Sequence, residues 1–152
     1  MGKNVNPRYT NVGDPTSNAT LTTSGTFGLV MTTAAADFTG ISANYQLCFT
    51  ANSTNGSRII GVHLEPIGTN VASVARIYVN NGATNGTAAN NQLIGQVSLP
   101  TTTTSNTAAF GSSDFYFAGG ALDLPASYRV YVGLGTTVAA GWVASPILGG
   151  QF

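Results

Sequence analysis

Residues 57–82, SRIIGVHLEPIGTNVASVARIYVNNG, carry the pattern that decides the fold. Apolar side chains recur at every second position on both sides of a break at Pro66 and Gly68. A period of two is typical of a strand with one buried face, because successive side chains point to opposite sides of a sheet. The stretch therefore predicts two strands folded back on each other as a hairpin. The residues expected on the buried face are Ile60, Val62, Leu64, Ala75, Ile77 and Val79.

The rest of the chain repeats this pattern with different loops. Residues 43–51, 93–99, 108–118 and 127–134 also alternate, and Gly, Asn, Ser and Pro separate them. Residues 26–33 and 141–152 are expected to form the first and the last strand, the last one broken by Pro146. We find no segment with the 3.6-residue apolar spacing of an amphipathic helix. About eight short strands of this kind predict an all-β fold, an antiparallel β-sandwich. The chain length favours a jelly-roll-like form of that sandwich.

The first 25 residues differ from the rest of the chain. They are polar and show no sustained periodicity, with Pro7 and Pro15 among them. We expect an extended N-terminal arm over residues 1–25 and a single β-sandwich domain over residues 26–152. Two of the five basic residues lie in the arm.

The composition excludes several classes of partner. Only 7% of the 152 residues are charged, against about 25% in a typical soluble domain, and five basic residues balance five acidic ones. Nucleic-acid binding needs clustered Lys and Arg, so we expect no nucleic-acid partner. No run approaches the roughly 20 apolar residues of a membrane span, so we expect no membrane contact.

The start of the chain lacks the apolar core of a signal peptide, which favours synthesis in the cytoplasm without export. A net charge of zero favours association with other protein surfaces.

Residues that support catalysis are few. Cys48 is the only cysteine and His63 the only histidine, and Cys48 lies in the middle of a predicted strand, where a small buried thiol is expected. His63 and Glu65 share a strand face, near Arg76 if the hairpin forms, which is typical of a polar cross-strand set on a surface. One Cys and one His cannot supply the four ligands of a structural zinc site, and the acidic residues lack the spacing of a calcium loop. We therefore expect no enzyme activity, no metal and no cofactor.

Five short motifs in residues 57–152 resemble a known family. They are an Arg-Ile strand start, a Gly-Thr turn, a strand that ends in Asn-Gly, a Leu-Pro-x-x-Tyr step and a terminal Gly-Gly-x-Phe. In this chain they stand at Arg58-Ile59, Gly68-Thr69 and residues 76–82, 124–128 and 149–152. Together they resemble small virion proteins of tailed bacteriophages that are regarded as capsid decoration, or cement, proteins.

The resemblance implies a jelly-roll-like β-sandwich without catalytic activity. Such a protein binds the outside of an HK97-type capsid shell as a homo-dimer or homo-trimer, in contact with the major capsid protein. The expected location is the outer capsid surface of the virion, after assembly in the bacterial host cytoplasm. We expect the arm residues Lys3, Arg8 and Tyr9 to contribute to the capsid contact.

A phage tail-fibre or receptor-binding module is the alternative function, because such modules share this β-rich composition of Thr, Asn and Gly. A glycan-binding module is a third interpretation. A sugar site usually displays an aromatic platform, and the outward candidates are Tyr78 and Tyr131, whereas Trp142 is expected in the core. The sequence contains neither a long repeated shaft nor a trimerising coiled coil, which favours the capsid role.

Overall fold

The computed structural model describes residues 29–151, which consist mainly of strands and loops. The predicted arm over residues 1–25, with Lys3, Arg8 and Tyr9, lies outside the described residues. The strands are β1 (Leu29–Met31), β2 (Gln46–Thr50), β3 (Ser57–Pro66), β4 (Ser73–Asn80), β5 (Asn91–Leu99), β6 (Ser113–Tyr116), β7 (Leu122–Leu124), β8 (Arg129–Leu134) and β9 (Trp142–Gln151). A short 3-10 helix, η1 (Ala88–Asn90), precedes β5.

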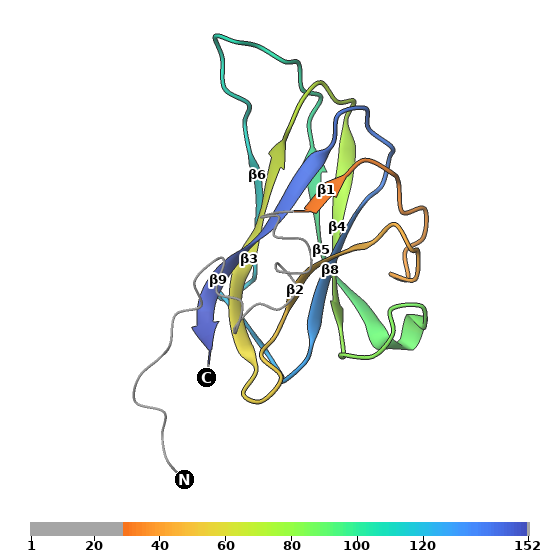
Figure 1. The fold of residues 1–152 in the computed structure, drawn as a ribbon, viewed down its shortest axis with the longest axis vertical. Coiled ribbons are helices and arrows are strands. Elements are labelled where there is room, and N and C mark those ends of the chain that lie inside the picture. Colours follow the sequence, from red (N-terminus) through yellow and green to blue (C-terminus); the bar gives the residue numbers. More distant parts are fainter. Residues whose placement is uncertain (1–28, 152) are drawn as a thin grey trace.

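The strands form two sheets packed face to face, as Figure 1 shows. Sheet A has the order β1-β9-β3-β6, and β7 also pairs with β3; sheet B has the order β2-β8-β4-β5. Every pairing between these strands is antiparallel. The all-β antiparallel sandwich is therefore confirmed. Two Greek keys in two packed sheets make a jelly roll, and this strand order favours that form, which stays a prediction.

The predicted hairpin is wrong, because β3 and β4 lie in different sheets. β3 pairs with β9, β6 and β7, whereas β4 pairs with β8 and β5. Residues 67–72 cross from one sheet to the other, and Asn70 in this crossing pairs with Thr102 through two backbone hydrogen bonds of 3.1 and 2.9 Å. Alternation shows that a strand has one buried face, but it does not identify the neighbouring strand.

The core lies between the two sheets. Its fully buried large side chains include Phe49, Leu64, Ile77, Val130, Val132, Leu134 and Trp142. One inward position differs from the prediction. Ile59 is fully buried and Ile60 only partly, because the β3–β9 register shifts between Ile59 and Gly61. Such a bulge inserts one residue into the strand and changes which side chain faces inward.

The chain itself covers much of the outer face of sheet B, over Tyr78 of β4 and Tyr131 of β8. Residues 34–45 fold over it, and Tyr45, Tyr78, Tyr131 and Ala35 form a second buried cluster. Asp37 organises this segment by accepting hydrogen bonds from the backbone N–H groups of residues 39, 41 and 42 at 2.8–3.2 Å. Burial raises the pKa of Asp37, but these bonds and one from the Thr39 hydroxyl outweigh it and lower the pKa.

This cover corrects two predictions. Tyr78 and Tyr131 point outward from sheet B, but they are only 1% and 8% exposed and present no aromatic platform to solvent. Arg76 lies on sheet B, so it is not beside His63; its guanidinium stacks 3.9 Å from the centre of the Phe38 ring. The guanidinium also donates to the carbonyl of Ala35 at 2.9 Å.

The buried thiol of Cys48 leads to a prediction about stability at high pH. Burial raises the pKa of Cys48 from its ordinary value of 9.0 to about 12. Between these values the unfolded chain loses the thiol proton and the folded chain keeps it, so ionisation favours the unfolded state. We expect the free energy of unfolding to fall by about 1.4 kcal/mol per pH unit through this thiol alone, with the contribution intact below the ordinary pKa.

The measurement compares urea unfolding of the wild type and Cys48→Ala across this pH range. Burial also raises the pKa of Tyr78, but that residue is present in both proteins, so the difference between their slopes isolates the thiol. Equal slopes would show that the thiol is not shielded in the folded state.

Candidate functional site

The outer face of sheet A carries exposed side chains among the described residues, Val30, Asp114 and Tyr116, whereas residues 34–45 lie over the outer face of sheet B. We call the first of these faces the sheet A outer face. Its side chains come from four adjacent strands and form three rows across the sheet, set by the registers of β1, β9, β3 and β6. The residues are Val30, Val143 and Glu65 in the first row, Ser145, His63 and Asp114 in the second, and Ile147, Gly61 and Tyr116 in the third.

The alternation of each strand explains why these side chains point outward. On β3, Val62 and Leu64 are fully buried, and His63 and Glu65 between and beside them are exposed by about 40% of their side chains. On β6, Phe115 packs against the core, and Asp114 and Tyr116 on either side point away from it. The local sequence therefore fixes which residues face solvent, and strand pairing brings them together.

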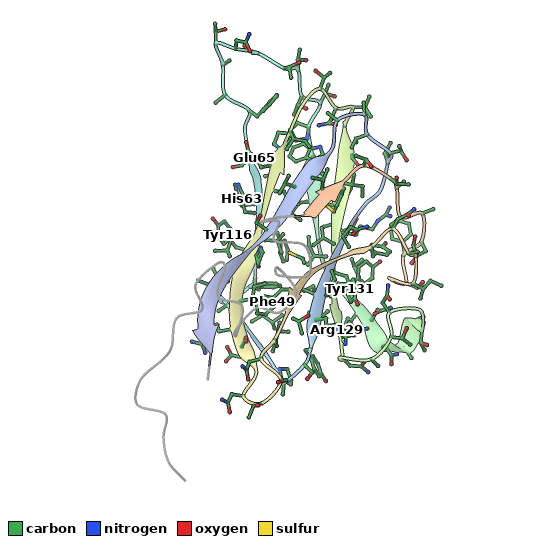
Figure 2. All side chains as sticks on the ribbon, in the orientation of Figure 1. Phe49, His63, Glu65, Tyr116, Arg129 and Tyr131 are labelled. Carbon is green, nitrogen blue, oxygen red and sulfur yellow. The ribbon has the colours of Figure 1, made fainter. Side chains whose placement is uncertain are left out.

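His63 is the centre of a polar cluster on this face. Its Nδ1 lies 2.6 Å from an oxygen of Asp114, and its Nε2 lies 3.6 Å from an oxygen of Glu65. The Tyr116 hydroxyl donates to the other Asp114 oxygen at 3.2 Å. Figure 2 shows Glu65, His63 and Tyr116 following one another down one side of the molecule, along β3 and β6, whereas Tyr131 and Arg129 lie along β8.

Two carboxylates, those of Asp114 and Glu65, lie beside His63 on this face. The hydrogen bond to Asp114, and then its negative charge, raise the pKa of the Tyr116 hydroxyl, so Tyr116 stays a neutral donor. At the far end of β3, Arg58 and Asp123 form a two-pronged ion pair of 2.6 and 2.8 Å. Both are about half exposed, so their contribution to stability is small.

The middle row places Ser145, His63 and Asp114 side by side, the three residue types of a catalytic triad. Asp114 orients the imidazole through Nδ1, as an acid does in such a triad. The other ring nitrogen faces Glu65, and no hydrogen bond joins it to Ser145 within the described residues. The row therefore offers donors, acceptors and an aromatic edge for binding, without a nucleophile in hydrogen-bond contact with its base.

Metal binding has little support in the same region. Within residues 29–151 no group of three or more His, Cys, Asp and Glu side chains is placed to hold a metal ion. Each ring nitrogen of His63 instead lies close to a carboxylate, Nδ1 to that of Asp114 and Nε2 to that of Glu65. Within the same range, no helix is long and apolar enough to cross a membrane.

The sequence predicted part of this cluster and missed the rest. His63 and Glu65 share a face as expected, and Trp142 is fully buried as expected. Cys48 is buried between the sheets, on the other side of sheet A from His63, so the two do not meet. Asp114 and Tyr116 were missed because they come from β6, about 50 residues away along the chain, and only the β3–β6 register brings them to His63.

Comparisons with known proteins add no relative. No family model, no curated protein and no solved structure matches this chain.

Proposed function

We propose that this chain is a structural virion protein that binds the outer surface of a bacteriophage capsid and stabilises it, without catalysis. The observation that carries the proposal is the contrast between the two faces of the sandwich. Residues 34–45 cover much of sheet B, whereas within residues 29–151 the sheet A outer face presents exposed apolar and hydrogen-bonding groups. We assign the contact with the major capsid protein to the sheet A outer face.

The chemistry of the face suits a protein partner. Val30 on β1 and Tyr116 of the His63 cluster are 50% and 58% exposed. Interfaces between proteins commonly place aromatic and aliphatic side chains beside a few paired polar groups. A ligand that binds only the assembled shell stabilises that shell by mass action. Since most contacts would be apolar or hydrogen-bonded, we expect the binding to persist at high salt.

The motifs that carry the family resemblance support the same proposal. Three of them lie far apart along the chain but adjacent in sheet A. Ser57, which precedes the Arg-Ile motif, pairs with Leu124 on β7 and with Gln151 on β9. These motifs therefore belong to one structural unit rather than to unrelated turns. The arm residues Lys3, Arg8 and Tyr9 stay predicted capsid contacts.

Co-sedimentation with expanded capsids that lack the decoration protein tests the proposal. We expect saturable binding of the wild type and at least about tenfold weaker binding of Ser145→Arg, which places a long cation in the middle of the sheet A outer face. Ser98→Arg is the matched control, because Ser98 is exposed on β5 of sheet B. No binding of the wild type would reject the function, and equal loss in both variants would reject the assigned face.

The competing function is a receptor-binding module of the phage tail. A parallel sedimentation with host cells separates the two, because a tail module binds cells and not capsids. The observation that favours an adhesive role is a polar pocket formed by residues of sheet B and the β4–β5 connection.

A further inference from the structure

A pocket of about 220 Å³ lies where the β4–β5 connection meets the start of β8. Figure 1 draws this connection, with η1, in green at the lower right, beside the ends of β4 and β8. It is formed by strands of sheet B and the loop between them, so it is separate from the sheet A outer face. Its lining includes Val79, Asn81, Asn90, Asn91, Gln92 and Tyr128.

The lining has a uniform chemistry. All of its residues are uncharged, and four of them carry a side-chain carboxamide. A carboxamide has two N–H donors and a carbonyl acceptor, which matches the paired donors and acceptors of neighbouring hydroxyl groups. Val79 and Tyr128 add an apolar wall on which the C–H face of a ring can pack. Without a cation in the lining, the pocket has nothing to neutralise a phosphate or carboxylate.

The loop that carries the pocket is held by hydrogen bonds between side chains. The Asn80 amide donates to the Oδ1 of Asn91 at 2.7 Å, and the Asn81 amide donates to the Oδ1 of Asn90 at 3.2 Å. The Asn90 and Asn91 amides in turn donate to loop carbonyls at 2.9 and 2.7 Å. A site that is ordered before binding loses less conformational entropy when it closes on a ligand.

Two polar side chains in the lining, those of Gln92 and Tyr128, make no hydrogen bond to other described residues. Gln92 is exposed and Tyr128 half-buried, so both are accessible from solvent. The fixed asparagines thus shape the pocket, and Gln92 and Tyr128 supply the groups that are free to bind.

From this geometry we propose that the pocket binds one ring of a neutral polyhydroxylated ligand, namely an uncharged sugar unit. Gln92 and Tyr128 donate and accept the hydrogen bonds, and the rings of the ligand and of Tyr128 pack together. The volume is below the usual range for drug-sized ligands, which favours a single ring and weak binding. This function goes beyond capsid stabilisation and uses a different surface, so either can be correct without the other.

The test is an NMR titration of the full chain, isotope-labelled, with the methyl glycosides of glucose, galactose, mannose, rhamnose and N-acetylglucosamine. We expect at least one of them to shift amide signals of residues 79–92 and 128 at millimolar concentration. Gln92→Ala should weaken that binding about tenfold, because it removes the free carboxamide. Gln96→Ala is the matched control, since Gln96 is exposed on the same strand but outside the pocket.

Three outcomes would overturn the proposal. The first is the absence of shifts with every glycoside, and the second is equal binding by wild type and Gln92→Ala. The third comes from a parallel titration with the methyl glycoside of N-acetylneuraminic acid: tighter binding of this charged sugar than of any neutral sugar would contradict the neutral class. Capsid co-sedimentation of Gln92→Ala should match the wild type, which keeps this test distinct from that of the capsid role.

Discussion

Replacing Asn70 by Ala is expected to lower the free energy of unfolding by about 3 kcal/mol. Asn70 is only 2% exposed and lies where three loops meet. Its amide donates to the carbonyls of Gly68 and Gly141 at 3.1 and 3.0 Å, and its Oδ1 accepts from the backbone N–H groups of Ala140 and Gly141 at 2.9 and 2.8 Å. Alanine leaves these buried groups without partners, which costs about 1–3 kcal/mol for each group that water does not reach.

The substitution Asn70→Asp should be nearly as damaging. Aspartate keeps the acceptor for the two N–H groups but turns the donor toward Gly68 and Gly141 into a second acceptor, which faces their carbonyl oxygens. Urea unfolding at neutral pH measures both variants. Asn106→Ala is the control, because Asn106 is exposed in the β5–β6 loop and should change stability by less than about 0.5 kcal/mol. If Asn70→Ala behaved like Asn106→Ala, the three loops would not depend on this side chain.

Replacing Gly61 by Ala is expected to lower the free energy of unfolding by at least about 2 kcal/mol. A Cβ at this position would lie 2.1 Å from the carbonyl oxygen of Phe115 and 3.3 Å from the Cα of Tyr116. Both atoms belong to the backbone of β6, which cannot rotate away as a side chain can. The strands must therefore separate at the Gly61–Tyr116 pair, and overpacking of this kind costs about 1–3 kcal/mol or more.

Urea unfolding and amide hydrogen exchange measure this effect. We expect faster exchange on β6 in Gly61→Ala, because its pairing with β3 is weakened. Gly111→Ala is the matched control: apart from its chain neighbours, no atom of the described residues lies within 4 Å of its added Cβ, so stability should be unchanged or rise by about 0.4–1 kcal/mol. Equal stability of the two variants would contradict the close approach of β3 and β6.

Much of the architecture was predictable from the sequence. Alternation placed Val62, Leu64, Ala75 and Ile77 in the core, and all four are fully buried. This works because burial of one strand face is a local property with a period of two residues. The same argument failed at Ile59 and Ile60. The bulge in β3 shifts the alternation by one residue, so Ile59 is buried where Ile60 was expected.

The candidate surface was less predictable, because it depends on which strands are neighbours. His63 and Glu65 are two residues apart and were placed together correctly. Arg76 was assigned to them through a hairpin that does not form, and Asp114 takes its place from β6. Pairing between distant strands is a choice among many similar amphipathic segments, and the composition of any one of them does not determine it.

The sequence by itself determined that this protein is an all-β sandwich, because its apolar side chains alternate over short segments separated by turn residues. It also determined that charges are few. Only the tertiary structure decided that residues 34–45 lie over sheet B, that Asp114 meets His63 on the sheet A outer face, and that Asn70 joins three loops. Those features arise from contacts between residues about 30 to 100 positions apart, and their energies come from burial and hydrogen bonding that exist only once the sheets have packed.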